Sequence, residues 1–329
     1  MLKSRRGVVF SAAAAVLSGA VLLAGPVGSP AEAADTPMKV VATTGMIADA
    51  ARQIGGDKVE VKALMGPGVD PHAYRQTRSD IAAMVGADLV LWHGLYLEAQ
   101  MEDFLRHAAE EQAVVAVAES LPRDGLLSHD DYADKFDPHV WMDPDRWSDV
   151  VIAIRDALIQ QAPAAEATFN ANTEAYLAEV AALGDYAKTV LATVPEDSRV
   201  LLTAHDAFNY FGEAYDFEVV GIQGISTESE AGLNQIAKLV DMLVERDIKA
   251  VFVESSVSDR NVRALVEGAA AKGHEVTIGG ELFSDAMGQD GTYEGTYLGM
   301  IDHNATTITH ALDGEAPARG RLDRLSAGS

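Results

Sequence analysis

The tripeptide Asp-Pro-His occurs twice in the chain, ending at His72 and at His139. Proline fixes its own φ angle and holds the preceding residue in an extended conformation, so the histidine that follows leaves the backbone in a defined direction. A side chain held in this way suits a binding site that must keep its geometry. Each motif also precedes a helical pattern, which places both histidines at the rim of an α/β fold, where ligands bind.

A third histidine and a carboxylate occur in similar positions. His205 ends an apolar run, and Asp206 directly after it is predicted to cap the next helix. Asp285 is reached after another β-rich run through a Gly-rich turn. Any one histidine at a strand end is more often a loop residue than a ligand, but four positions of matching character favour a site. Three imidazoles and one carboxylate form a complete coordination set for a first-row divalent ion.

Other polar residues could support this site. Metal-bound imidazoles need hydrogen-bond partners that orient them, and Glu254, Asp143 and Ser284 are the candidates. His93 ends a predicted strand and could line the cleft in which this site is expected to lie. His129 lies in an acidic stretch that could collect cations loosely, although a solvated loop explains it as well.

Apolar runs rich in β-branched residues alternate with helical patterns along the chain, which is typical of an α/β fold. Half of the predicted strands fall in each half of the chain, so the sequence predicts two α/β lobes, each with a parallel sheet. The predicted strands lie at 38–44, 59–65, 87–93, 113–119, 199–205, 217–223, 248–256 and 274–280.

One long helix is predicted between the halves. Over 164–194 the apolar residues fall mostly three or four apart, and Pro163 and Pro195 bracket the pattern. Such a helix is about 45 Å long and could run the height of both lobes. As a linker it would restrain hinge motion, whereas an ordinary long surface helix would give the same pattern.

Composition excludes several classes of protein. The chain has 329 residues and a formal net charge of −25, so its surface repels nucleic-acid phosphates and anionic membranes. It contains no cysteine, which excludes thiolate ligands, disulfides and a lipid-modified cysteine. Basic residues ahead of an apolar stretch at 8–23 predict an export signal cleaved near Ala33. No later segment reaches the roughly 20 apolar residues of a spanning helix, so we expect no membrane insertion.

Five multi-residue stretches stand out along the chain: GVDPHAYRQTRSD, DPHVWMDP, TAHDAFNYFGEAYDFEVVGIQGISTESEAG, VFVESSVSDR and ELFSDAMG. Together they closely resemble the TroA-like family, the solute-binding receptors of bacterial ABC importers for manganese and zinc. The resemblance spans nearly all of the chain after the predicted signal, and the stretches follow the family's order. It implies two α/β lobes with one metal ion between them, held by His72 and His139 from the first lobe and by His205 and Asp285 from the second.

The resemblance also implies an organisation and a role. The expected function is high-affinity capture of one divalent ion as cargo, Zn²⁺ or Mn²⁺, and its delivery to the membrane permease of an ABC importer. We expect a periplasmic monomer without enzymatic activity. The expected parts are a signal peptide at 1–33, an N-terminal α/β lobe at 34–163, a linking helix at 164–195, a C-terminal α/β lobe at 196–314 and a loosely ordered tail at 315–329.

A zinc-dependent hydrolase is the alternative function, with Glu254 as the general base for a zinc-bound water. The sequence lacks His-Glu-x-x-His, and a fourth protein ligand would fill the position that this water needs. The sequence leaves the choice of metal open. Three imidazoles and a carboxylate suit tetrahedral Zn²⁺, while bidentate binding by Asp285 would make Mn²⁺ acceptable.

Overall fold

The structure is a computed structural model that describes residues 36–128, 135–229 and 231–326. The predicted export signal and His129 lie outside these residues. Within them, no helix has both the length and the apolar character needed to cross a membrane.

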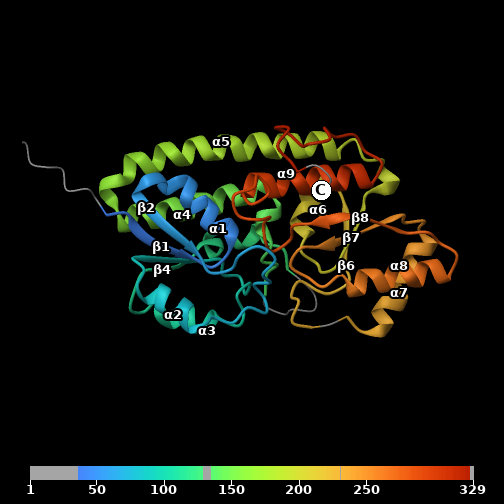
Figure 1. Cartoon of the computed structure of the whole chain (residues 1–329), viewed down its shortest axis with the longest axis horizontal. Helices are drawn as coiled ribbons and strands as arrows, with labels where there is room; N and C mark the ends of the chain where they lie inside the picture. The colour runs from blue at the N-terminus through green and yellow to red at the C-terminus, as the bar shows by residue number, and fades with distance from the viewer. Residues whose placement is uncertain (1–35, 129–134, 230, 327–329) are drawn as a thin grey trace, which may run out of the picture. The chain divides into compact units, whose positions relative to one another are not determined.

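The predicted α/β fold with parallel sheets is confirmed (Figure 1). Every predicted run contains or overlaps a strand, although most strands are shorter than the run. The strands are β1 (Met38–Ala42), β2 (Val59–Ala63), β3 (Leu89–Trp92), β4 (Val114–Ala116), β5 (Val200–Thr203), β6 (Glu218–Gly221), β7 (Ala250–Glu254) and β8 (Thr277–Leu282).

The first half of the chain forms a four-stranded sheet in the order β2-β1-β3-β4, with all neighbours parallel. One of its two central strands, β3, is buried along its whole length, which explains why that run is continuously apolar rather than alternating. Because the strands are parallel, their carboxyl ends share one edge. The loops that follow β2 and β4 carry the two Asp-Pro-His motifs.

The second half contains two parallel pairs, β5 with β6 and β7 with β8, and β5 also contacts β7. His205 lies just after β5 and Glu254 is the last residue of β7. The contact between these strands therefore brings the two side chains to the same edge.

Helices connect the strands as an α/β fold requires. Among the described residues the α-helices are α1 (Gly45–Gly55), α2 (Arg78–Val85), α3 (Glu102–Ala108), α4 (Pro144–Gln161), α5 (Glu166–Leu191), α6 (Asn209–Tyr215), α7 (Leu233–Glu245), α8 (Arg260–Ala271) and α9 (Tyr297–Ala311).

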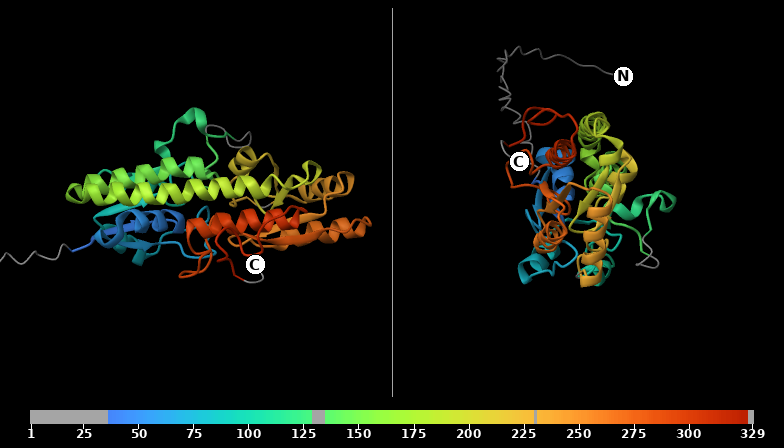
Figure 2. Two further views of the ribbon diagram at one scale, coloured as in Figure 1. Left: turned by 90° about the horizontal axis from the view of Figure 1, so that it is seen from above. Right: turned by 90° about the vertical axis from the view of Figure 1, so that its right-hand side faces the viewer.

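The long helix between the halves is confirmed as α5, which has 26 residues. It follows a short 3-10 turn at Pro163–Ala165 and ends before Pro195. It packs on α1 and α4 of the first half and on α9 at the end of the chain (Figures 1 and 2). The helix therefore contacts both halves, as a restraining linker must.

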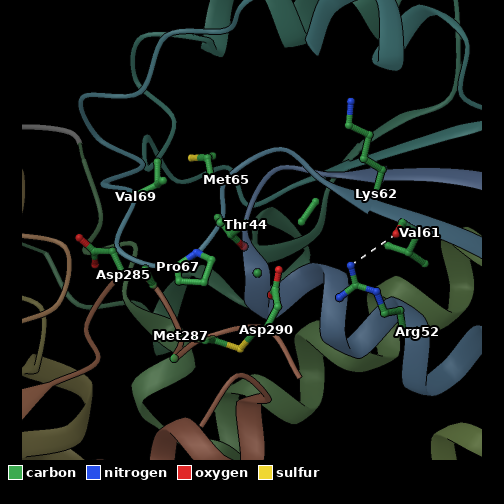
Figure 3. A pocket seen from close by; sticks show the side chains of 15 residues that line it. Thr44, Arg52, Val61, Lys62, Met65, Pro67, Val69, Asp285, Met287 and Asp290 are labelled. Carbon is green, nitrogen blue, oxygen red and sulfur yellow. Dashed lines mark hydrogen bonds between the residues drawn. The ribbon is translucent and has the colours of Figure 1, made fainter. Parts of the chain in front are cut away.

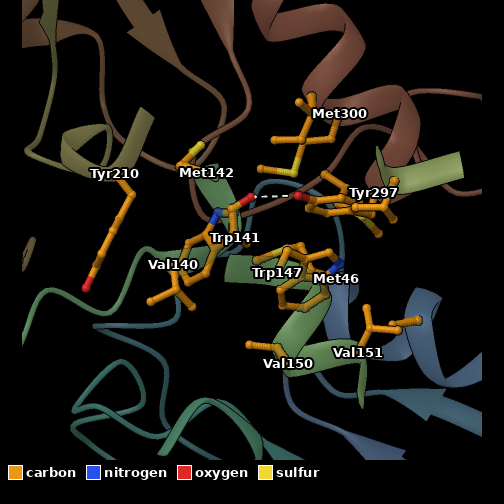
Figure 4. Close-up of a cluster of buried hydrophobic side chains, with 14 of the residues drawn as sticks. Met46, Val140, Trp141, Met142, Trp147, Val150, Val151, Tyr210, Tyr297 and Met300 are labelled. Carbon is orange, nitrogen blue, oxygen red and sulfur yellow. Dashed lines mark hydrogen bonds between the residues drawn. The ribbon is translucent and has the colours of Figure 1, made fainter. Parts of the chain in front are cut away.

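One apolar cluster runs through both halves along the side covered by these helices. The rings of Trp147 on α4 and Tyr297 on α9 stack with their centroids 5.0 Å apart (Figure 4). The cluster continues to Phe169 on α5 and to Phe252 in β7. Since this shared core would be disrupted by a wide separation of the halves, it supports restrained motion between them.

Two local predictions differ from the structure. Asp206 does not cap the following helix, because α6 begins later, at Asn209, with Phe208 in the N-cap position. Asp143 contacts other groups than the predicted ligands: its carboxylate caps α4 and pairs with Arg146.

Residues at the end of the chain contact α9. The Arg321 peptide N–H donates to both carboxylate oxygens of Asp302 at 3.0 Å, and Leu325 is buried. The predicted division of the chain into lobes, linker and tail is not decided by these contacts and stays a prediction.

Candidate metal centre

The four side chains predicted as ligands converge at one point. One nitrogen from each of His72, His139 and His205 and one carboxylate oxygen from Asp285 all lie within 4.8 Å of one another. All four residues are at least 98% buried. They come from the loops after β2, β4, β5 and β8, so parallel strand ends from both halves bring them together.

The spacing between the donor atoms fits a single small cation. Nε2 of His139 lies 3.4 Å from Nε2 of His72 and 3.3 Å from Nε2 of His205. The carboxylate oxygens of Asp285 lie 3.2 Å from Nε2 of His205 and 3.4 Å from Nε2 of His139. Ligands placed about 2.1 Å from one tetrahedral centre lie about 3.4 Å apart. The site is therefore already shaped for a first-row ion.

Two of the histidines are oriented by buried carboxylates. Nδ1 of His139 donates to Asp137 at 2.7 Å, and Nδ1 of His205 donates to Glu254 at 2.6 Å. These bonds keep a proton on Nδ1, so Nε2, which faces the common point, is the nitrogen that a metal ion would bind. Carboxylate partners of this kind orient metal-binding imidazoles and raise their basicity.

Burial and charge set the protonation of the histidines. Burial lowers the pKa of His72 to about 3, which keeps its imidazole neutral. Burial also acts to lower the pKa of His139, but the carboxylates of Asp137 and Asp285 outweigh it and raise the pKa to about 9. A metal ion must displace the proton held there, so metal affinity should fall as the pH falls.

Asp285 supplies the negative charge of the site. Burial acts to raise the pKa of its carboxyl, but His205 and His139 outweigh this effect and hold the pKa well below its ordinary value. Within the described part of the chain, neither oxygen of this buried carboxylate accepts a hydrogen bond. A buried, ionised carboxylate is costly unless a positive charge neutralises it, and at this site that charge is either an imidazolium or a bound metal ion.

The residues predicted to support the ligands differ in what they contact. Glu254 contacts His205 with both oxygens, since it also accepts the His205 peptide N–H at 2.8 Å. Those contacts remove the free general base that a hydrolase would need. Nε2 of His93 donates to the Pro138 carbonyl at 2.7 Å, so this histidine supports the second Asp-Pro-His loop rather than the ion. The Ser284 hydroxyl contacts Ser256.

In each Asp-Pro-His motif the aspartate is a hydrogen-bond partner of the motif's own histidine, which the sequence analysis does not predict. Asp70 and Asp137 were interpreted only as part of a rigid loop, yet each accepts the peptide N–H of the histidine two residues later at 2.9 Å. The signal was present, because Asp commonly bonds the backbone two residues ahead in turns. Trp141 was also missed: its ring contacts that of His139, with centroids 5.2 Å apart.

A cavity of about 310 Å³ reaches the site from one side (Figure 3). Asp285 lines it together with Thr44, Met65 and Pro67 from the first half and Met287 from the second. Among the described residues that line this cavity, Asp285 is therefore the one predicted ligand.

The arrangement suits holding an ion better than transforming a substrate. Four protein donors fill a tetrahedral sphere, which leaves no open position for a reactive water. Both halves contribute ligands, so a bound ion would join them. Among the described residues, one buried group of four ligand side chains lies between two α/β halves that share one long helix, which is the arrangement of a metal-binding receptor of the solute-binding class.

Comparison with known proteins gives the family. Residues 40–311 match the family model described as "ZnuA: Zinc-uptake complex component A periplasmic", and the chain belongs to this family. It is 48% identical over 300 residues to the manganese-binding lipoprotein MntA of Bacillus subtilis, covering 91% of this chain and 98% of that protein. It is 45% identical over 285 residues to the zinc-binding protein TroA of Treponema pallidum, covering 87% and 92%.

Structural comparison agrees. The solved structure of the periplasmic zinc-binding protein TroA from Treponema pallidum has a TM-score of 0.82 to this chain at 45% identity, covering 84% of this chain and 99% of that one. The prediction of a TroA-like fold is therefore confirmed, and the family is one of uptake components rather than hydrolases.

Proposed function

We propose that this chain captures one divalent transition-metal ion outside the cytoplasmic membrane and delivers it to the permease of an ABC importer. The ligands in this proposal are His72, His139, His205 and Asp285. The observation that carries it is their convergence from both halves into one buried group with spacing suited to one ion. The names of the two relatives, one manganese-binding and one zinc-binding, support metal cargo.

The donor set supports binding of both Zn²⁺ and Mn²⁺, with zinc bound more tightly. Divalent ions follow an affinity order in which zinc lies well above manganese at sites of this kind. Both oxygens of Asp285 are available, so the carboxylate can bind through two atoms and satisfy the higher coordination number that manganese prefers. Metal availability, rather than affinity alone, would then decide the physiological cargo.

We further propose a periplasmic monomer that docks on its permease. The family description, which includes the word periplasmic, and the predicted export signal support this location. The Bacillus relative is by its name a lipoprotein, whereas this sequence has no cysteine to carry a lipid. Cell fractionation that recovers the chain in the soluble extracytoplasmic fraction is the expected result, and recovery in washed membranes would contradict it.

Elemental analysis and metal competition test the binding function. Purified protein should bind one equivalent of Zn²⁺ or Mn²⁺, with Zn²⁺ displacing Mn²⁺ at buffered free concentrations. His205→Ala and Asp285→Ala should each lose at least a hundredfold in affinity, since each removes a ligand and leaves a buried group unpaired (about 3 kcal/mol). His107→Ala is the matched control, because His107 is exposed on α3. Parent-like affinity in both ligand variants would refute the assignment.

A further inference from the structure

In the first Asp-Pro-His motif, the aspartate lies between its own histidine and the opposite half of the protein. The His72 peptide N–H donates to Oδ1 of Asp70 at 2.9 Å, and the Thr227 hydroxyl donates to Oδ2 at 2.6 Å. Thr227 belongs to the second half, in the segment between β6 and α7. One carboxylate therefore joins the backbone of a first-half ligand to a second-half side chain.

The second motif repeats this arrangement with a different partner. Oδ1 of Asp137 accepts both the peptide N–H and the ring Nδ1 of His139, at 2.9 and 2.7 Å. The side-chain amide of Asn209, at the start of α6 in the second half, donates to Oδ2 at 3.0 Å. Two motifs far apart in the chain thus use one oxygen for their own histidine and the other for the opposite half.

This geometry links two events. A carboxylate is planar, so its two oxygens cannot be reoriented independently, and the proline after each aspartate limits the movement of the loop. When the halves are together, the second-half donor holds the carboxylate and, through it, the ligand histidine. When the halves separate, that donor is withdrawn and the histidine loses part of its support.

We propose that the aspartates of both motifs are positioning residues that couple closure of the halves to alignment of the ligand histidines, and that their second-half donors thereby slow release of the captured ion. This inference rests on the proposed function. It assigns to Thr227 and Asn209 a role in retaining metal, although neither reaches the ion.

The two motifs are not equally secured. The second motif has further bonds to the second half: the Tyr210 hydroxyl donates to the Asp137 carbonyl at 2.9 Å, and nearby Nε1 of Trp141 donates to the Ser284 carbonyl at 2.8 Å. Among the described residues, Thr227 is the one second-half residue that donates a hydrogen bond to Asp70. Loss of the Thr227 hydroxyl should therefore have a larger effect than loss of the Asn209 amide.

Metal release from the full chain tests this inference. Thr227→Val removes the hydroxyl and keeps the shape of the side chain, and all four ligands remain. We expect the dissociation rate of Zn²⁺ into excess chelator to rise roughly tenfold, which corresponds to about 1.4 kcal/mol. The association rate and the absorption spectrum of bound Co²⁺ should stay as in the parent, because the ligands are unchanged. Asn209→Ala should raise the dissociation rate less.

Two further variants make the outcome specific. Thr227→Ser restores the hydroxyl and should restore slow release. Thr189→Val removes an exposed hydroxyl on α5 that donates to the Asp185 carbonyl of the same helix, so its release rate should match the parent. The inference is overturned if Thr227→Val releases metal at the parental rate or if Thr227→Ser fails to restore the slow release of the parent. It is also overturned if Thr189→Val accelerates release as much as Thr227→Val does. A parent that binds no metal would overturn the proposed function as well.

Discussion

The carboxylate partner of a ligand histidine decides which ring nitrogen is offered to a metal ion. Glu254 accepts two N–H groups of His205, one from the peptide and one from the ring. Both donors need an acceptor, and a carboxylate has two acceptor oxygens. An amide side chain at position 254 would have only one acceptor oxygen, so its NH₂ group would face one of the two N–H donors of His205.

Glu254→Gln should therefore weaken Zn²⁺ binding by roughly 10- to 100-fold, the usual loss when such a partner is removed. Competition with a chelator of known affinity would measure it. Glu245→Gln is a matched control, because Glu245 ends α7 outside the metal site and should bind as the parent does. Unchanged affinity in Glu254→Gln would show that the contact does not orient His205.

The ligands themselves could be predicted from the sequence, whereas their supports mostly could not. Proline and strand-end signals are local, so they mark His72 and His139 from a few neighbouring residues. The contact of Asp70 with Thr227 joins positions separated by the long helix and most of two sheets. Only tertiary packing creates such a pair, and no local pattern announces it.

At the scale of elements, the loop after β2 must approach the second half closely. Gly68 has a φ of +72°, and a Cβ atom there would lie 3.3 Å from the Ser255 carbonyl oxygen in the second half. Gly273 has a similar φ of +81°, but a Cβ atom there would meet nothing within 4 Å. Substitutions at Gly68 and at Gly273 therefore share the penalty of a left-handed backbone, but only a substitution at Gly68 also crowds the second half.

Gly68→Ala and Gly273→Ala should both lower the free energy of unfolding by roughly 1–2 kcal/mol, because a left-handed conformation penalises a Cβ atom. Only Gly68→Ala should also weaken metal binding, by roughly fivefold or about 1 kcal/mol, since it crowds the closed form. Urea unfolding and metal titration of both variants measure the two effects. If both variants lost the same metal affinity, the loss in Gly68→Ala would follow from lower stability and not from crowding between the halves.

The order of the elements followed from the sequence because the apolar runs are long and well separated. The cap position did not follow from the sequence: Asp206 is predicted as the N-cap of α6, but Phe208 occupies that position. Asp206 resembles an N-cap in sequence, but the chain after β5 first makes a short turn in which the His205 carbonyl accepts the peptide N–H of Ala207. Placing His205 in the site thus took precedence over the local capping preference.

At the scale of the whole molecule, the ion should be a structural tie as well as a cargo. A ligand that binds only the folded protein at about 1,000 times its Kd stabilises it by roughly 4 kcal/mol. Removal of metal by EDTA should therefore lower the Tm by on the order of 10 °C. Differential scanning calorimetry measures the shift.

His205→Ala provides the control for that experiment. It lacks a ligand, so its Tm should hardly respond to EDTA. A shift of the same size in this variant would mean that EDTA acts elsewhere than at the four-residue site.

The distribution of the ligands along the chain also sets when during its life the protein can take up metal. His72 and His139 precede the long helix, and Asp285 lies near the end of the last strand. A chain still being synthesised therefore has at most part of the coordination sphere. Tight uptake has to wait for the complete, folded polypeptide.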